Sequence, residues 1–489
     1  MTDEHRDMTG RRGLVRGLAA GGIGLAGLGL MAKPAHADEV GGPFVGAVVN
    51  VKDVGAIGDG VADDTAALQR AIATADPGDG IFFPPGNYVI RQTLRPKAGQ
   101  VFFSHARRAT ITSVNGSFVM FVCRSGPVQF HHLRLDGRRA DTAAPAQPDV
   151  VRAILVQASE TNPNIDLVVN DCHVVGAWGT GIETVGARHE DDRVVIADTT
   201  VEGCGFYGIQ LRFTHHGSIR GCTLRKNRHG FGGDEVRHVH VEHTRAVAND
   251  RHGILFIFSQ DWHVDSCWAE RNSLVMAGGS GIVSGGVFRD PMPPVNSDYS
   301  ITNNVCVGNG TAGITIDPAV RQEPAVIQRQ RAVVAGNVCR DADKFHGINV
   351  THARDVTIVG NICEGNPYSG IQLASASHVM VEGNTCRDNQ FGIGLSSNTV
   401  VDDPGHHHIG PNHLYDNDVD INHEIYQGAY PMTDIRQVGL HGSVEPEGVV
   451  MADPGTQYEQ HRGHGGSLWV KESGRMSTTG WRRMRGSVR

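Results

Sequence analysis

The feature that most constrains this sequence is a short motif, a glycine followed by isoleucine or phenylalanine, that recurs through the middle of the chain. The motif begins at Gly181, Gly208, Gly230, Gly253, Gly281, Gly313, Gly347, Gly370 and Gly392. Each copy opens a run of alternating apolar and polar residues, which is the pattern of a half-buried strand. The basic spacing of 22 to 23 residues, with longer insertions, predicts one coil of a right-handed parallel β-helix. Two-helix repeats are longer, and no propeller signature or leucine consensus is present.

The composition also indicates a turn-rich β protein. The chain of 489 residues has 63 glycines, 20% charged residues and 6% aromatic residues, which excludes a disordered chain, a coiled coil and collagen. The formal net charge of -8 comes without any long basic run. Nucleic acid is therefore not expected as a partner.

The start of the chain predicts an export signal. Arg11 and Arg12 precede a glycine-rich apolar run at residues 17–32, and residues 35–37 (AHA) have the small-x-small form of a signal-peptidase site. Paired arginines before such a run resemble a twin-arginine signal. The run is too short for a membrane span, and no later stretch is long enough for one. We expect a bacterial protein that is secreted, periplasmic or attached to the cell surface.

The nine cysteines recur in a shared context, a turn followed by cysteine. This context is found at Cys204, Cys222, Cys306, Cys339, Cys363 and Cys386. A free buried cysteine packs like a small hydrophobic residue. We therefore expect cysteine to fill one position of the repeat and to form a column in the core, in preference to disulfides or a metal site.

Ahead of the repeats, residues 50–65 read NVKDVGAIGDGVADDT and lead into an apolar-periodic stretch at 66–72. Asp64 or Thr65 can act as N-cap, so we expect a short amphipathic helix that covers the open first coil. Together with residues 82–88 (FFPPGNY), this region closely resembles the N-terminal signature of the pectate-lyase-like superfamily. That superfamily includes polygalacturonases, polysaccharide lyases, alginate C5-epimerases and phage tailspike depolymerases. The resemblance implies the fold and leaves the reaction open.

Candidate site residues follow from the alternation of side chains along each strand. If the residue after each glycine points inward, the second and fourth residues after it point to solvent. One patch about three coils, or ~10 Å, high is expected to hold side chains suited to sugar chemistry. Its members are Tyr207, Gln210, Arg212, His229, Asp234, Arg251 and His252.

The stretch from Tyr207 to residue 253 also resembles the catalytic module of mannuronan C5-epimerases. There the tyrosine, the aspartate and an Arg-His pair lie in the active groove, which implies Tyr207, Asp234, Arg251 and His252 here. Where that family has Asp-Pro-His just after its Tyr-Gly-Phe, this chain has residues 210–212 (QLR). The family's calcium-binding nonapeptide modules are also missing.

Two enzymatic chemistries and one binding role are compatible with these residues. In a uronate lyase or C5-epimerase, Arg212 or Arg251 would neutralise the sugar carboxylate, His229 or His252 would abstract the C5 proton, and Tyr207 would donate one. A glycoside hydrolase or fructosyl-transfer enzyme would instead use two carboxyl groups. Glu183 and Asp234, two coils apart at roughly 9 to 10 Å, suit an inverting pair, and Glu235 and Asp317 are further candidates. The third reading is a polysaccharide-binding surface protein without catalysis.

The glycine motif ends near residue 430, and a small β tail is expected beyond it. The expected segments are a signal peptide at 1–37, a β-helix catalytic domain at 38–430 and a C-terminal β tail at 431–489. The tail, or the β-helix itself, could mediate homo-oligomerisation. Residues 406–408 (HHH) are adjacent in one loop and cannot all face one metal ion, so no metal ligands are assigned. No cofactor is implied, and a role for Ca²⁺ is left open because no dedicated loop motif is present.

Overall fold

The computed structural model describes residues 46–124, 126–159, 163–273, 278–286, 296–318, 328–397, 406–425, 436–437, 440–442, 445–448, 457–462, 465–474 and 477–484. The chain divides into two compact units, Met1–Gly42 and Pro43–Arg489, and the first lies outside the described residues. The expected signal peptide therefore also lies outside them. Everything below concerns the second unit.

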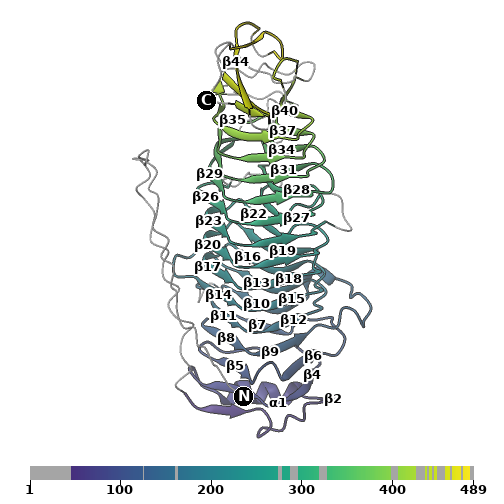
Figure 1. Cartoon of the computed structure of the whole chain (residues 1–489). Helices are drawn as coiled ribbons and strands as arrows, with labels where there is room; N and C mark the ends of the chain where they lie inside the picture. The colour runs from purple at the N-terminus through teal and green to yellow at the C-terminus, as the bar shows by residue number, and fades with distance from the viewer. Residues whose placement is uncertain are drawn as a thin grey trace, which may run out of the picture. The chain divides into compact units, whose positions relative to one another are not determined.

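The second unit is an all-β, right-handed parallel β-helix (Figure 1), as the repeat predicts. Each regular coil contributes one strand to each of three sheets, named here sheets C, A and B in the order in which the chain passes through them. Neighbouring strands of each sheet come from successive coils and pair in parallel register, except in the C-terminal tail. Residues at equivalent positions of successive coils therefore form straight columns along the stack.

Sheet C comprises β7 (Phe121–Cys123), β10 (Arg152–Gln157), β13 (Thr180–Val185), β16 (Tyr207–Arg212), β19 (His229–Asp234), β22 (Ile254–Ile257), β25 (Ile282–Gly285), β28 (Ala312–Asp317), β31 (His346–Thr351), β34 (Ser369–Ala374), β37 (Phe391–Ser397) and β40 (Val419–Ile425). Sheet A comprises β1 (Val48–Asn50), β3 (Gly80–Phe83), β5 (Val101–Ser104), β8 (Val128–His131), β11 (Asp166–Asn170), β14 (Arg193–Ala197), β17 (His215–Arg220), β20 (Arg237–Glu242), β23 (Gln260–Asp265), β26 (Tyr299–Thr302), β29 (Gln328–Ala335), β32 (Ala353–Val359), β35 (Ser377–Glu382), β38 (His408–Ile409) and β41 (Arg436–Gln437). Sheet B comprises β2 (Asp59–Asp63), β4 (Gly86–Ile90), β6 (Ala109–Ser113), β9 (Leu133–Asp136), β12 (His173–Val175), β15 (Thr200–Glu202), β18 (Thr223–Arg225), β21 (Arg245–Val247), β24 (Trp268–Glu270), β27 (Val305–Val307), β30 (Val338–Arg340), β33 (Ile362–Glu364), β36 (Thr385–Arg387), β39 (Asn412–Tyr415), β42 (Leu440–Gly442), β43 (Gln457–Arg462), β44 (Gly465–Lys471) and β45 (Trp481–Arg483).

The glycine motif places one fully buried residue per coil in sheet C. Ile182, Ile209, Phe231, Ile254 and Ile282 pair in register and are 0% exposed. The glycine before each of them is required by close packing. A Cβ on residue 208, for example, would lie 2.8 Å from both Asn227 Nδ2 and the Gly230 carbonyl oxygen. The motif therefore marks the start of a strand whose backbone packs too closely against the next coil to leave room for a side chain.

Two columns of buried amides bracket sheet B. In the first column, the Asn337 side chain accepts from the Asn304 backbone N–H, and the same relation links Asn361 to Asn337 and Asn384 to Asn361. The second column begins five residues later in the coil and connects Asn227, Asn249, Asn272 and Asn309, then Asn366, Asn389 and Asn417. Each ladder satisfies backbone groups in the turns, where no strand partner is available.

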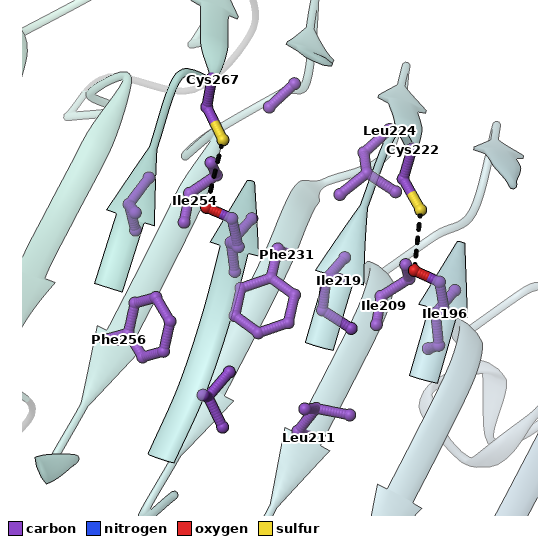
Figure 2. Close-up of a cluster of buried hydrophobic side chains, with 14 of the residues drawn as sticks. Ile196, Ile209, Leu211, Ile219, Cys222, Leu224, Phe231, Ile254, Phe256 and Cys267 are labelled. Carbon is purple, nitrogen blue, oxygen red and sulfur yellow. Dashed lines mark hydrogen bonds between the residues drawn. The ribbon is translucent and has the colours of Figure 1, made fainter. Parts of the chain in front are cut away.

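All nine cysteines are free and buried, as expected, but they do not occupy a single position of the repeat. Cys306, Cys339, Cys363 and Cys386 pair in register within sheet B and form one core column. Cys172, Cys222 and Cys267 instead share the first ladder column, where their thiols donate to main-chain carbonyl oxygens. Figure 2 shows this contact for Cys222 and Cys267. Cys204 stands in the second ladder column, where its N–H donates to Asn227. Cysteines that share the same sequence context, a turn followed by cysteine, therefore lie at different positions relative to the turn.

The two ends of the stack carry different elements. At the N-terminal end, α1 (Thr65–Thr74) buries Ala67, Leu68, Ala71 and Ile72 (Figure 1). Asp64 is at the N-cap position, but its carboxylate accepts from the loop N–H groups of residues 57 and 58 and does not cap the helix. At the other end, β43, β44 and β45 pair antiparallel and form the expected β tail. A 3-10 turn, η1 (Pro148–Val150), precedes β10, and no helix among the described residues has the length and apolarity needed to cross a membrane.

Candidate functional site

The candidate site lies on the outer face of sheet C, where β13, β16, β19 and β22 are neighbours. The second and fourth residues after each glycine line up in two columns outside the main core, as the alternation predicts, but Glu183, Gln210 and Asp234 are buried and do not point to solvent. The columns are Glu183, Gln210, Gly232 and Leu255, and Val185, Arg212, Asp234 and Ile257. A third column is formed by the residues just before each glycine.

That third column holds a stack of three rings, Tyr207, His229 and His252, on three successive coils. The ring centroids of Tyr207 and His229 lie 4.6 Å apart with planes 19° apart, and those of His229 and His252 lie 5.3 Å apart with planes 30° apart. The Tyr207 ring leans across the next strand, because a Cβ on Gly232 would lie only 2.4 Å from its Cε1. These contacts bring together three side chains that can transfer protons.

Two arginines flank the stack, and neither has an ion-pair partner among the described residues. Arg228 and Arg251 precede the second and third ring of the stack, and the Arg251 backbone N–H donates to the Arg228 carbonyl oxygen. The Nε atoms of both side chains are buried without an acceptor among the residues that the structure describes. The Arg228 guanidinium lies 5.5 Å from the centroid of the Phe206 ring. Such enclosed donors suit an anionic ligand.

Burial and charge set the protonation states of the stack. Burial and the Asp234 carboxylate raise the pKa of Tyr207 to about 12, although nearby guanidinium groups act in the opposite direction. Burial, then His252 and the two flanking arginines, lower the pKa of His229 to about 2. Burial and Arg251 lower the pKa of His252 to about 4. At neutral pH the stack therefore consists of a phenol and two uncharged imidazoles.

The hydrogen bonds distinguish the two imidazoles. His252 Nδ1 accepts from the backbone N–H of Ser280 at 3.2 Å, so its neutral ring carries the proton on Nε2 and can donate from there. His229 Nδ1 is buried without a hydrogen-bond partner among the described residues. His252 can therefore donate from Nε2. For His229, the described contacts of Nδ1 do not determine whether this nitrogen donates or accepts.

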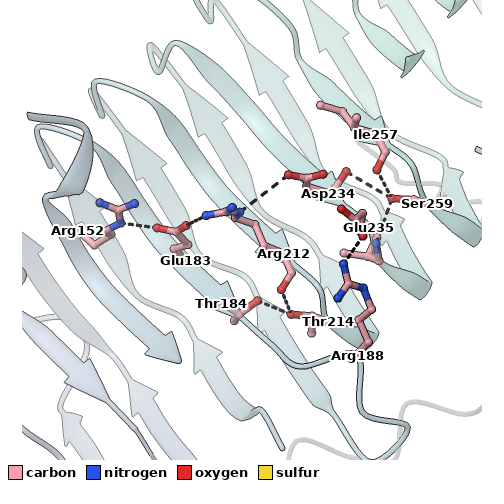
Figure 3. Close-up of polar contacts among 12 residues, drawn as sticks. Arg152, Glu183, Thr184, Arg188, Arg212, Thr214, Asp234, Glu235, Ile257 and Ser259 are labelled. Carbon is pink, nitrogen blue, oxygen red and sulfur yellow. Dashed lines mark hydrogen bonds and ion pairs between the residues drawn. The ribbon is translucent and has the colours of Figure 1, made fainter. Parts of the chain in front are cut away.

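The carboxylates beside the stack form a continuous chain of ion pairs (Figure 3). Glu183, 1% exposed, pairs with Arg152 Nε and with Arg212 Nη1, the latter at 3.5 Å. Arg212 Nε lies 3.9 Å from Asp234 Oδ2. The Arg212 guanidinium thus lies between the two carboxylates that were predicted as an inverting pair.

The remaining predicted residues lie at the margin of this group or away from it. Gln210 is buried directly beside Glu183 in the register. Glu235 turns away in a left-handed conformation and pairs with Arg188 (Figure 3). Asp317 is three strands from Asp234, about 14 Å along the stack, and lies 3.6 Å from His352. Glu235 and Asp317 thus lie away from the ring stack, and their part in a carboxyl pair or in substrate binding stays a prediction.

Sequence reasoning missed three contributors to the site. Phe206 packs edge-on against Tyr207, with ring centroids 4.7 Å apart, and Arg228 lies over Phe206. Arg152 pairs with Glu183 from the coil before. Phe206 and Arg228 lie in the turns that enter the strands, where the period-2 pattern does not give side-chain direction. Their offset of 22 residues is one coil, which is the signal that could have placed them together.

An apolar surface adjoins the stack. Tyr207, Leu255 and Val283 form a small buried cluster of their own outside the main core, with Phe206 and Ile257 packed against it. A sugar ring presents apolar C–H faces as well as hydroxyl groups. The candidate site thus combines an apolar surface, proton-transfer groups and unpaired guanidinium donors.

The adjacent histidines at residues 406–408 make different contacts. His407 is 1% exposed and its Nδ1 accepts from the Val379 N–H, whereas the His406 ring stacks on His378. Among the described residues, one group of side chains converges as metal ligands do. It comprises Glu190, His216 and His238 on sheet A, away from the ring stack.

Two family models match the chain. Residues 48–233 match the family described as "Rhamnogalacturonase A/epimerase, pectate lyase-like", and residues 198–429 match "Periplasmic copper-binding protein (NosD)". The first match and the parallel β-helix support the pectate-lyase-like β-helix superfamily. The N-terminal signature at residues 50–65 lies within the region of that match.

Relatives of this chain include the mannuronan C5-epimerases of Azotobacter vinelandii. The chain is 25% identical to AlgE5 over 322 residues, which are 63% of this chain and 26% of AlgE5. It is 50% identical to AlgE2 over 52 residues, which are 10% of this chain and 5% of AlgE2. The matched regions thus cover only a minor part of these relatives. The local match has the length of the epimerase-like stretch identified from the sequence.

Solved structures support the fold. The A-module of mannuronan C5-epimerase AlgE4 from Azotobacter vinelandii aligns with a TM-score of 0.53 at 18% identity, over 79% of this chain and 99% of that structure. The pre-mature gene product 12 of bacteriophage phi29 aligns with a TM-score of 0.58 at 15% identity, over 82% of this chain and 60% of that structure. At such identities these alignments show only that the β-helix fold is shared.

Proposed function

We propose that this protein is a carbohydrate-active enzyme that removes the C5 proton of uronate residues in an extracellular polysaccharide. The observation that carries the proposal is the Tyr207, His229 and His252 stack flanked by Arg228 and Arg251, whose Nε donors have no acceptor among the described residues. A uronate carboxylate would supply that acceptor. The sequence similarity to mannuronan C5-epimerases supports the same substrate class.

In this proposal the arginines make the C5 proton removable. Losing that proton places negative charge on C5 and on the adjoining carboxylate, and two fixed guanidinium groups would stabilise the charge as it develops. Burial is the main cause of the low pKa of His229, and the bound carboxylate would offset the further contribution of the neighbouring positive charges. His229 would then be a better proton acceptor in the complex with substrate than it is in the free protein.

Tyr207 is assigned the opposite role. Because its pKa is raised to about 12, the phenol is protonated at neutral pH and donates rather than accepts. Donation to C5 from the face opposite to abstraction gives the epimer. Donation to the departing glycosidic oxygen gives a lyase. The two outcomes share the same residues and differ in where the sugar lies relative to Tyr207.

The glycosidase alternative has less support. An inverting pair needs open space between its carboxyl groups for the sugar and a water molecule. The Arg212 guanidinium contacts both Glu183 and Asp234 in that interval. The pair is better suited to holding Arg212 in place beside the stack.

The proposal is tested by incubating the full chain with polymannuronate, polygalacturonate and a neutral glucan. Ultraviolet absorbance reports unsaturated uronate, reducing ends report cleavage, and NMR in deuterated water reports exchange at C5. Tyr207→Phe is expected to lower the rate by about 10²- to 10⁴-fold, the usual size of a general acid–base contribution. Tyr368→Phe is the matched control, since Tyr368 enters the same face six strands away, at about 29 Å.

The outcomes separate the three functions. Absorbance together with reducing ends indicates a lyase, and C5 exchange without either indicates an epimerase. Reducing ends without absorbance, lost in Glu183→Gln and kept in Tyr207→Phe, would replace the proposal with hydrolysis. Binding of a polysaccharide without any of these signals would leave a non-catalytic surface protein.

We also propose that the protein is exported. The paired arginines, the apolar run and the residues 35–37 support this, and the family model matched by residues 198–429 is described as periplasmic. Expression in a bacterium should yield a chain that begins at Asp38 outside the cytoplasm, as mass spectrometry of fractionated cells would show. An uncleaved chain confined to the cytoplasm would contradict the proposal.

A further inference from the structure

A second cluster of functional side chains lies on sheet A, on a different face from the ring stack. His216 in β17 and His238 in β20 are 22 residues apart and occupy equivalent positions of successive coils. Both residues have left-handed backbones, with φ of 54° and 50°. Their rings stack with centroids 4.8 Å apart and planes 15° apart. The repeat thus presents two imidazoles side by side at the surface.

A carboxylate from another segment meets these rings. Glu190 lies in the loop between β13 and β14, and its Oε2 is 3.8 Å from His216 Nε2. One ligand atom each from Glu190, His216 and His238 lies within 4.8 Å of the others. A point equidistant from three atoms at that spacing is about 2.8 Å from each, and metal–ligand bonds of about 2.0 to 2.2 Å need only a modest inward movement. The Glu190 side chain is 65% exposed and can make that movement.

An independent observation points to a ligand at the same place. The His215 side chain is only 7% exposed, and its Nδ1 lies 3.2 Å from Glu190 Oε1 without making a hydrogen bond. A buried imidazole nitrogen this close to the Glu190 carboxylate is suited to orient it from behind, as outer ligands of metal sites do. Arg237 Nη1, 4.0 Å from the same carboxylate oxygen, is the one competing cation among the described contacts of Glu190.

We propose that Glu190, His216 and His238 bind a divalent transition-metal ion, with His215 orienting the carboxylate. Two imidazoles and one carboxylate are a ligand set that Zn²⁺ and its neighbours in the first transition series accept, whereas Ca²⁺ and Mg²⁺ prefer oxygen ligands alone. Three protein ligands leave one coordination position open. The ion would tie the loop at 186–192 to two coils of sheet A. The site does not depend on the uronate chemistry of sheet C.

The experiment is isothermal titration of the full chain, freed of metal with a chelator, with zinc chloride and separately with calcium chloride. One Zn²⁺ per chain and no Ca²⁺ are expected. His238→Ala and Glu190→Gln should each raise the Zn²⁺ dissociation constant by at least about tenfold. The matched control is His378→Ala, because the rings of His378 and His406 stack with centroids 5.1 Å apart and belong to no group of three metal-ligating side chains among the described residues.

A second readout excludes simple loss of folding. Circular dichroism should be unchanged in every variant, and Zn²⁺ should raise the melting temperature of the wild type and of His378→Ala but not of His238→Ala. Absence of Zn²⁺ binding in the wild type would overturn the proposal. So would equal weakening in His238→Ala and His378→Ala, because surface histidines in general would then account for the binding.

Discussion

The asparagine ladder beside sheet B allows one stability prediction to be worked through in detail. Asn361 is 1% exposed, and its side chain makes five hydrogen bonds. Its Oδ1 accepts from the backbone and side-chain nitrogens of Asn337, each at 2.9 Å. Its Nδ2 donates to the carbonyl oxygens of Val334 and Val359 and to Asn384 Oδ1. Asn361→Ala removes all five and leaves two buried N–H donors of Asn337 without an acceptor.

The expected loss follows from these contacts. A buried donor left unsatisfied costs about 1 to 3 kcal/mol, so two of them and the weakened carbonyl contacts together cost about 3 to 5 kcal/mol. The entropy of unfolding of a body of this size is about 0.8 kcal/mol/K, which converts the loss into a fall in melting temperature of about 4 to 6 °C. Asn349→Ala is the matched control, because the Asn349 side chain makes one hydrogen bond among the described residues, from Thr351 Oγ1 at 3.4 Å.

Differential scanning calorimetry of the full chain measures both variants, and circular dichroism checks that the β-helix is retained at room temperature. A fall of under 1 °C in Asn361→Ala, or an equal fall in both variants, would refute the reasoning. It would mean that water or main-chain relaxation replaces the ladder without cost. Asn361→Asp is a further check, since it keeps both acceptor contacts to Asn337 but places a negative charge against Asn384 Oδ1.

Two further predictions concern titratable groups. Burial lowers the pKa of His346 to about 4, below its unfolded value of about 6.5, so its contribution to stability is complete above pH 6.5 and is lost as the pH falls toward 4. His346→Gln should therefore reduce the slope of unfolding free energy against pH in that window by up to about 1.4 kcal/mol per unit, measured by urea denaturation, and an unchanged slope would contradict the assignment. The nine cysteines are buried and free, so an aromatic disulfide reagent should label none quickly in the native protein and all nine in denaturant; fast native labelling, or fewer than nine thiols in denaturant, would count against the described core.

Part of the fold could be predicted because each coil carries the same short sequence motif. The glycine motif marks the entry of each sheet C strand, and alternation then fixes which side chains face outward, as Glu183 and Arg212 illustrate. Cysteine positions could not be resolved in the same way. Cys222 and Cys306 both follow a turn, yet one joins the ladder column and the other the sheet B core. An offset of two residues relative to the turn decides between them.

The candidate site was only partly predictable for a related reason. Tyr207 and His229 could be placed together because they hold the same position of successive coils. Arg228 could not, because side-chain direction in a turn depends on the neighbouring coil and not on local periodicity. Nor does alternation show that Arg212 bridges Glu183 and Asp234. Asp317 has the outward orientation predicted for it but lies too many coils away.

The constant distance between the two amide ladders has a consequence for how such a chain can change length. Ladder positions are five residues apart in every coil where both are present, as in Asn304 and Asn309 or Asn384 and Asn389. The stretch from a second-ladder residue to the next first-ladder residue varies much more, from 18 residues between Asn366 and Asn384 to 32 between Asn272 and Asn304. Insertions and deletions are therefore admitted only on the side of sheets C and A. Both candidate sites lie on that side, so evolution or an engineer can rebuild a binding surface there while the sheet B edge stays the same.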